Sequence, residues 1–223
     1  TGRARPSRGM VLRLAEVLGL PRAEANGMLG AAGFSAQFPV LGLDAAGMAE
    51  VRRAMDWTIQ RHAPYPAVIM DRLWRIVALN GPAKQIFGPA GFQEGASLLE
   101  ALADLSLFAA LIENWPEVGH HTLLRLRAES ARAGGVVDLD RAAAVLAGDP
   151  QIAGFQPKGP PRAVVPTIYR MGDRRLPLFS TYAQFGSADE VALADMKIEL
   201  MFPADAAAEA FLRSLDPGGD QNP

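Results

Sequence analysis

The chain has 223 residues and a mass of 23.8 kDa, long enough for one main domain with an appendage. Hydrophobic residues make up 49% and charged residues 21%, which excludes a largely disordered protein, and the net charge of −2 argues against a nucleic-acid-binding surface over the whole molecule. Because it has no cysteine, the chain cannot form disulfides, thiolate nucleophiles or cysteine-bound zinc. No apolar stretch reaches the roughly 18 to 20 residues of a membrane-spanning helix, so we expect a cytoplasmic protein with no membrane partner.

Residues 1–34 predict an arginine-bearing loop followed by two short helices. Apolar residues recur at helical spacing over residues 10–18, and Ser7 is placed to cap this first helix. Pro21 begins a second helix, which ends at Gly33. Two helices of this length bury little surface on their own.

Residues 35–63 predict a linker and then a connecting helix. In this helix the spacing of Val51, Met55 and Ile59 places them on one apolar face, which we expect to be buried. Trp57 is a further candidate for the buried side.

Residues 64–88 predict a strand, a tight polar turn, a second strand and a capped helix in direct succession. Ala67–Met70 is a short apolar run, and residues 74–79 alternate in the manner of a half-buried strand. Asn80 closes the strand pair and can cap the next helix, because its side-chain oxygen can accept an N–H that the first helical turn leaves unpaired. Pro82 in that turn loses no needed donor.

A helical block, a loop and a second group of strands follow. The helical patterns cover residues 98–103, 105–113, 115–132 and 139–147. The Pro/Gly-rich stretch 151–162 predicts a loop. The strand patterns cover 163–171, 176–185 and 197–202, with a hairpin signal at Gly172-Asp173 and a final helix over 205–215.

These patterns together predict an α+β fold, in which a five-stranded antiparallel sheet carries a large helical insertion between its first two strands and its last three. This connectivity matches PAS-type sensor domains, in which one sheet face and the helices enclose a ligand cavity. We expect residues 64–215 to form this domain and residues 216–223 to form a flexible tail.

Five sequence segments, spread over nearly the whole chain, resemble the MmyB-like family of bacterial helix-turn-helix regulators of the XRE type. They are GRARPS with LRLAEVLGL, the AAGF at 31–34, PYPAVIMDRLWRIVALN, the NWPEV at 114–118 with RLRAE after it, and LFSTYAQFGSADEVALADMKIELMFPAD. The resemblance implies a DNA-binding helix-turn-helix domain joined to a PAS-like ligand-binding domain, with long-chain fatty acids as the ligand class.

In the same resemblance, residues 1–34 correspond only to the last two helices of the DNA-binding domain. The recognition helix that enters the major groove is absent from this match. We therefore expect the intact regulator to bind operator DNA and this polypeptide alone to bind it poorly or not at all.

The helix over 115–132 carries the most suggestive candidate ligand contacts. Trp115, Gly119, Thr122 and Leu126 form one stripe, with Val118 beside it and Arg125 at its edge. Arg125 and Arg127 are candidate anchors for a carboxylate, because a guanidinium offers a planar fork of donors; the alternative is a solvated face or an ion pair with an acid such as Glu117 or Glu129. The full candidate set is Met70, Trp74, Phe87, Phe108, Asn114, Trp115, Val118, His121, Arg125, Phe179, Tyr182 and Met201.

The histidines argue against a metal site. His120 and His121 are adjacent and point to different sides of a helix, whereas metal-binding helices place ligands at i and i+4. The remaining histidine, His62, lies in a separate segment. His121 can instead bond a ligand or a buried carbonyl, and Ser180 and Thr181 are ordinary strand residues or further ligand contacts.

The sequence lacks the motifs of common enzyme classes: there is no G-x-S-x-G, no G-x-x-x-x-G-K-[ST] and no G-x-G-x-x-G. We expect no catalysis and no cofactor. The preferred hypothesis is an effector-sensing region whose apolar ligand alters the geometry of a homodimer. The alternative is a dimerisation or partner-binding module whose interior is filled by its own side chains, namely Trp74, Phe87, Phe108, Trp115, Phe179 and Met201.

Overall fold

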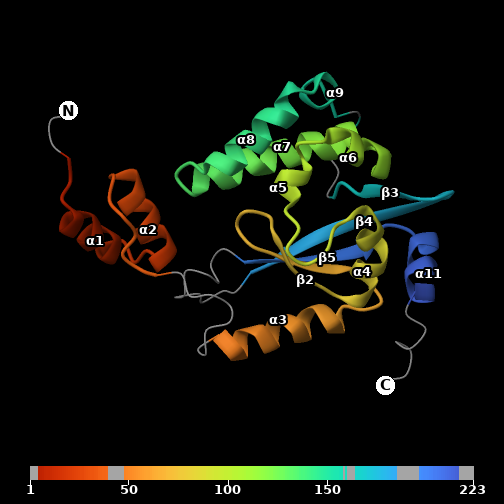
Figure 1. Ribbon diagram of the computed structural model, residues 1–223, viewed down its shortest axis with the longest axis horizontal. Coiled ribbons are helices and arrows are strands. Elements are labelled where there is room, and N and C mark those ends of the chain that lie inside the picture. The colour runs from red at the N-terminus through yellow and green to blue at the C-terminus, as the bar shows by residue number, and fades with distance from the viewer. Residues whose placement is uncertain (1–4, 40–47, 158, 160–163, 185–195, 216–223) are drawn as a thin grey trace.

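The computed structural model describes residues 5–39, 48–157, 159, 164–184 and 196–215. The tail expected at 216–223 lies outside the described residues, as do parts of the expected linker and of the strand expected at 163–171. A helical pair near the N-terminus precedes an α+β domain built on one sheet (Figure 1). Within the described part of the chain, no helix is both long and apolar enough to cross a membrane.

The helical pair consists of α1 (Arg8–Val17) and α2 (Arg22–Ala31), which pack against each other. As predicted, Ser7 caps α1, because its Oγ accepts a hydrogen bond from the Met10 N–H at 3.2 Å. Gly19 follows at φ +63°, a left-handed conformation that favours glycine, so the helix ends there. The buried residues of the pair are Val11, Ala15, Ala25 and Leu29.

The predicted α+β fold is confirmed: five antiparallel strands form one sheet in the order β2-β1-β5-β4-β3. The strands are β1 (Ala67–Met70), β2 (Ile76–Leu79), β3 (Thr167–Met171), β4 (Arg174–Ala183) and β5 (Lys197–Pro203). Because β1 pairs with β5 at the centre, the strands before and after the helical insertion form one sheet. The predicted hairpin joins β3 to β4, with Gly172 at φ +61°.

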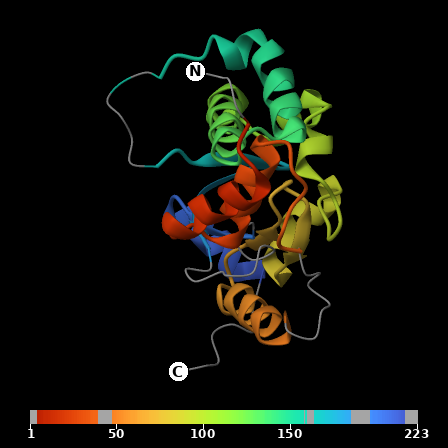
Figure 2. The ribbon, with the colours of Figure 1, turned by 90° about the vertical axis from the view of Figure 1, so that its left-hand side faces the viewer.

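Helices lie on both faces of the sheet, with α3 on one side and α7 and α8 on the other in both views (Figures 1 and 2). The helices of this domain are α3 (Ala49–Arg61), α4 (Gly81–Phe87), α5 (Leu98–Ala101), α6 (Leu105–Leu111), α7 (Trp115–Arg132), α8 (Val137–Gly148), α9 (Pro150–Ala153) and α11 (Ala206–Leu215), with a 3₁₀ turn at Gly88–Ala90. The short α9 occupies the start of the stretch predicted as a loop, because Asp149 caps it by accepting hydrogen bonds from two backbone N–H groups.

Strand alternation divides the sheet into two faces. On the face toward α3, Ala67, Ile69 and Ile198 pack with Met55 and Ile59. The opposite face, which we call the inner face, joins α4 and α11 in a second core. The inner-face residues of that core include Val68, Met70, Leu176, Leu178 and Met201.

The predicted burial of Trp57 is wrong, because its side chain is 62% exposed. It lies two residues after Met55 in α3, which turns it about 200° around the helix from the buried face. The Arg61 guanidinium covers its ring at 5.2 Å from the centroid.

Asn80 is fully buried and caps α4 as predicted, by accepting a hydrogen bond from the Ala83 N–H at 3.1 Å. The same oxygen accepts from the Ala67 N–H at 3.0 Å. Its amide nitrogen donates to the carbonyls of Ile59 and Tyr65, at 3.0 and 2.8 Å. One side chain thereby joins α3, β1 and the start of α4.

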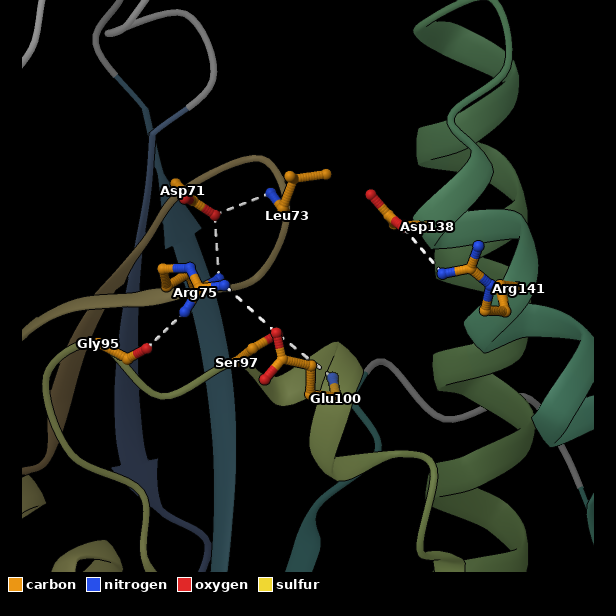
Figure 3. Close-up of polar contacts among 8 residues, drawn as sticks. All are labelled: Asp71, Leu73, Arg75, Gly95, Ser97, Glu100, Asp138 and Arg141. Carbon is orange, nitrogen blue, oxygen red and sulfur yellow. Dashed lines mark hydrogen bonds and ion pairs between the residues drawn. The ribbon is translucent and has the colours of Figure 1, made fainter.

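The predicted strand over residues 74–79 is too long, since β2 begins at Ile76. Trp74 instead lies in the turn between the strands at φ +56°. The Asp71 carboxylate shapes this turn by accepting hydrogen bonds from the Leu73 and Arg75 N–H groups, at 2.8 and 2.9 Å (Figure 3). The turn directs the Trp74 side chain into the core, where it is 6% exposed.

Candidate ligand-binding site

A cavity of about 210 Å³ lies between the inner face of the sheet and the helices that cover it. The sheet contributes alternate residues, such as Val68 and Met70 on β1, because neighbouring residues on a strand point to opposite faces. The helices α4 to α7 contribute mostly apolar side chains. The result is a largely apolar space with charged groups at its margins.

Most of the candidate residues from the sequence lie around this cavity. They are Met70, Trp74, Phe87, Phe108, Trp115, Val118, Arg125, Tyr182 and Met201. Trp74 is therefore both a core residue and a cavity-lining residue. In α7, Thr122 also lines the cavity, whereas Arg127 is exposed on another side of the helix.

The other three candidates lie elsewhere. The Asn114 side chain joins α7 to β3, because Nδ2 donates to the Pro166 carbonyl at 2.9 Å and Oδ1 accepts from the Ile168 N–H at 3.0 Å. His121 is exposed on α7. Phe179 points to the α3 face of the sheet, where it stacks on Phe202 with ring centroids 5.5 Å apart.

Several residues that line the cavity were not among the candidates predicted from the sequence. They include Val68, Ile76, Leu79, Ile86, Leu98, Leu102, Ile112, Thr167, Tyr169, Arg170 and Glu199. Strand alternation was the available signal for Val68 and Glu199, which lie two residues before the candidates Met70 and Met201. The lining residues from the short helices have no comparable periodic signal.

Arg125 lies at the polar end of the cavity between two aromatic rings. Its guanidinium carbon is 4.6 Å from the centroid of Trp74 and 3.9 Å from that of Tyr182. Nε donates to Glu129 Oε1 at 2.9 Å, and Nη1 donates to the Tyr182 hydroxyl. Of the alternatives open for Arg125, the ion pair with Glu129 is the one that forms.

Glu129 collects three donors on its partly buried carboxylate. Besides Arg125, it accepts a hydrogen bond from Trp74 Nε1 at 2.8 Å and one from Lys197. Burial by itself raises the pKa of the Glu129 carboxyl, but the hydrogen bonds from Lys197, Trp74 and Arg125 outweigh burial and hold that pKa below its usual value. The carboxylate therefore stays charged at neutral pH and fixes the positions of two residues that line the cavity.

Among the described residues, Glu199 is the acid that lines the cavity, and it lies opposite Tyr182 in the β4–β5 pair. The Tyr182 hydroxyl accepts a hydrogen bond from Arg125 and lies close to the Glu199 carboxylate. Burial, followed by the nearby Glu199 carboxylate, raises the pKa of Tyr182 and of Tyr169 well above the usual range. Both phenols therefore stay neutral and available as hydrogen-bond donors.

Arg170, on β3, is the other cationic residue that lines the cavity. Its Nη1 donates to the carbonyls of Ala109, Ala110 and Ile112, at 2.8, 3.2 and 3.0 Å. These carbonyls lie at the C-terminal end of α6, where a cation is favoured by the helix dipole. Arg170 thus holds α6 against β3 and closes the helical side of the cavity.

Trp115 stacks on Phe108, with centroids 5.1 Å apart and planes at 19°. Among the described residues, its indole Nε1 is the buried side-chain polar atom without a hydrogen-bond partner. The ring lies against Gly119, where an added Cβ would be 3.5 Å from Trp115 Cε2 and 2.7 Å from Ile152 Cδ1. The small residue at Gly119 thus allows Ile152 and Trp115 to meet over α7.

We expect Gly119→Ala to lower the free energy of unfolding by about 1 kcal/mol, because overpacking against buried Ile152 outweighs the gain in helix propensity. Urea denaturation followed by circular dichroism measures the change. Gly148→Ala, with no atom within 4 Å of its added Cβ, is the matched control and should be neutral or stabilising. A stabilised Gly119→Ala protein would contradict the close packing described at this point.

A second hollow of about 500 Å³ lies at the surface between the β1–β2 turn, α5 and α8. Figure 3 shows its polar contacts: Arg75 donates to the Gly95 carbonyl at 2.7 Å and to Glu100 at 3.3 Å, and Arg141 pairs with Asp138 at 3.2 Å. These pairs are solvent-exposed and contribute little binding or stability. The apolar cavity on the inner face of the sheet is therefore the candidate site.

Comparison with known families relates this site to a regulator domain. The family model described as the MmyB-like transcription regulator ligand binding domain matches residues 51–215, about three quarters of the chain. The chain belongs to this family. All residues named above as lining the cavity lie within the matched range, whereas α1 and α2 precede it.

Two other comparisons add little to the family match. No curated protein matches the chain. Among solved structures, the PAS domain from Bordetella pertussis BvgS is similar at 14% sequence identity and a TM-score of 0.37, over 75% of this chain and 96% of that one. A similarity at this level carries no functional argument.

Proposed function

We propose that this MmyB-like domain is the effector-sensing region of a transcription regulator and binds a small apolar molecule in the cavity on the inner face of the sheet. The observation that carries the proposal is the cavity itself, about 210 Å³ of mainly apolar lining with a polar end at Arg125. The alternative was an interior closed by its own aromatic side chains. Trp74, Phe87, Phe108 and Trp115 line the cavity but leave it open, which favours the effector.

The size of the cavity limits the ligand. A water-sized group occupies about 30 Å³, so the cavity holds about seven such groups before any side chain moves. Burying about seven methylenes contributes about 5–6 kcal/mol, against an association cost of at least about 4 kcal/mol. Fatty acids or similar lipids are the ligand class implied by the family resemblance, and a longer chain requires the covering helices to move outward.

We also propose that the intact regulator is a cytoplasmic homodimer that binds DNA through a helix-turn-helix domain to which α1 and α2 belong. The effector must bind two conformations of the dimer unequally, since a ligand with equal affinity for both shifts nothing. The helices that cover the cavity are best placed to change position when the effector binds, because they contact the ligand on one side and solvent on the other.

Native mass spectrometry of the purified protein, followed by lipid extraction, tests the proposal directly. We expect a bound mass that disappears after extraction and returns when an apolar molecule is added. Val118→Phe fills the cavity from α7 and should weaken binding by more than about tenfold, because a close-packed interior has no room for both the ring and a ligand.

Leu124→Phe is the matched control for this experiment. Leu124 lies on the same helix but is 48% exposed, so the new ring projects away from the cavity. This variant should bind as the unaltered protein does. Equal binding by both variants, or no binding of any apolar molecule by the unaltered protein, would favour the interaction module instead.

A further inference from the structure

The side of α3 that points away from the sheet carries an exposed tryptophan. Met55 and Ile59 are buried against the sheet, and Trp57 projects in the opposite direction with 62% of its side chain exposed. Among the described elements, α3 packs chiefly on β1 and β5, and it is the outermost of them on its side of the sheet (Figures 1 and 2). The exposed residues on this side, which we call the outward face of α3, are Glu50, Arg53, Ala54, Trp57 and Arg61.

Trp57 has the features of an interface anchor. The Arg61 guanidinium lies 5.2 Å from the centroid of its ring, so a cation–π contact holds the indole in position and covers one of its faces. Tryptophan and arginine are among the residues most enriched at the energetic centres of protein interfaces. A partner that covers the rest of the ring buries apolar surface on a side chain that is already ordered.

The charges on the outward face favour a second copy of this chain as that partner. Glu50 and Arg53 pair at 3.1 Å near the start of the helix, with side chains 76% and 74% exposed, and Arg61 is its last residue. A face with an acid at one end and a base at the other complements itself when two copies pack antiparallel. This face lacks the charge of a single sign that attracts nucleic acid.

We propose that the outward face of α3 is a homodimer interface, on which α3 of a second copy packs antiparallel about a two-fold axis midway between Ala54 and Trp57. In this arrangement Trp57 lies on Ala54 of the partner subunit, and Glu50 pairs with Arg61 of the partner subunit. The two-fold symmetry forms each of these contacts twice. The small side chain of Ala54 leaves room for the indole, and the charged pairs lie about 8 Å along the helix on either side of the axis.

Charge selects this register over its neighbour. If the axis crossed at Trp57 instead, Arg53 would face Arg61 of the partner subunit, and like charges across an interface repel each other. A single helix pair buries less surface than a standard interface, so we expect a reversible dimer whose population depends on the protein concentration. The inference rests on the homodimer of the proposed function, to which it adds the interface.

Sedimentation equilibrium of the full chain over a range of concentrations tests the interface. We expect the unaltered protein to dimerise and Trp57→Ala to raise the dimer dissociation constant at least about thirtyfold, because the tryptophan is a central anchor in both copies. Leu124→Ala removes a large apolar side chain that is 48% exposed on α7 and should leave the dissociation constant unchanged. Circular dichroism shows whether each variant has kept its fold.

Charge reversal tests the antiparallel arrangement. Glu50→Arg places a second base opposite Arg61 of the partner subunit and should weaken the dimer at least about tenfold. Arg61→Glu should weaken it in the same way, because two acids then face each other. The double variant restores opposite charges and should bring the dissociation constant back to within about threefold of that of the unaltered protein.

The outcomes separate this inference from the proposed function. A dimer that Trp57→Ala leaves intact, or that Leu14→Ala on α1 dissociates instead, would overturn the interface on α3 while the homodimer stands. A double charge reversal that fails to restore the dimer would overturn the antiparallel register. A chain that stays monomeric at every concentration would overturn both the interface and the homodimer, whereas the effector in the cavity is tested separately by mass spectrometry.

Discussion

Replacing Asn80 with alanine should lower the free energy of unfolding by about 3–5 kcal/mol. The substitution leaves the N–H groups of Ala67 and Ala83 and the carbonyls of Ile59 and Tyr65 without their hydrogen-bond partner. Each buried polar group left unsatisfied costs about 1–3 kcal/mol, and relaxation recovers part of the total. Urea denaturation followed by circular dichroism measures the loss.

Two further variants show which part of Asn80 matters. Asn80→Asp keeps the accepting oxygen but replaces the donor that bonds the Ile59 and Tyr65 carbonyls, so it should be about as destabilising as alanine. Ser97→Ala removes the single, more exposed cap bond to the Glu100 N–H and should lose about 1 kcal/mol or less. If the free energy of unfolding of Asn80→Ala lies within about 1 kcal/mol of that of the unaltered protein, the helix cap is the main contribution of Asn80 to stability.

Replacing Glu129 with alanine should lower the free energy of unfolding by about 2–4 kcal/mol and disorder the polar end of the cavity. The side chains of Arg125, Glu129 and Lys197 are only 25%, 16% and 12% exposed, so removing the acid takes an ion-pair partner away from two poorly solvated cations. Trp74 also loses the acceptor of its indole N–H. Denaturation and tryptophan fluorescence measure the two effects.

The same carboxylate makes the domain sensitive to acid. The pKa of Glu129 is lowered in the folded protein, so its contribution is present in full above the unfolded pKa, near 4.5, and is lost as the pH falls through the lower folded value. Glu129→Gln should therefore show a smaller loss of stability than the unaltered protein as the pH falls below about 4.5. Glu113→Gln, at an exposed ion pair with Arg175, serves as control and should change that dependence less. An identical pH profile for Glu129→Gln and the unaltered protein would contradict this role.

Local signals in the sequence predicted much of the fold. Neighbouring residues determine the composition of the strands, the Gly172 turn and the caps at Ser7 and Asn80. These features can therefore be predicted without the tertiary structure. Two local predictions failed. Trp57 was assigned to the buried side although helical spacing turns it about 200° from Met55, and the turn made by Asp71 displaced Trp74 from the strand to which it was assigned.

The residues of the candidate site also divide into those that local sequence patterns predicted and those that only the tertiary structure shows. Trp115, Val118 and Arg125 were identified because a single helix carries them at helical spacing, and Arg125 and Glu129 are one turn apart. Glu199 was not identified, although strand alternation places it on the same face as Met201, and only the pairing with the Tyr182 strand shows which groups it meets. Phe179 was included because strand residues are apolar on either face, and only the sheet register shows which face a residue occupies.

The sequence by itself determined the order of the elements, the α+β class and the family, because these follow from local periodicity and from motifs in a fixed order. Only the tertiary structure decided that the interior is not filled and that Arg125, Glu129 and Lys197 meet at the polar end of its cavity. Both properties arise from residues far apart in the chain: Trp74, α7 and β5 meet there only after the first and last strands of the sheet have paired. The cavity volume and the ion pairs at its polar end depend on such long-range contacts, and no local sequence pattern predicts them.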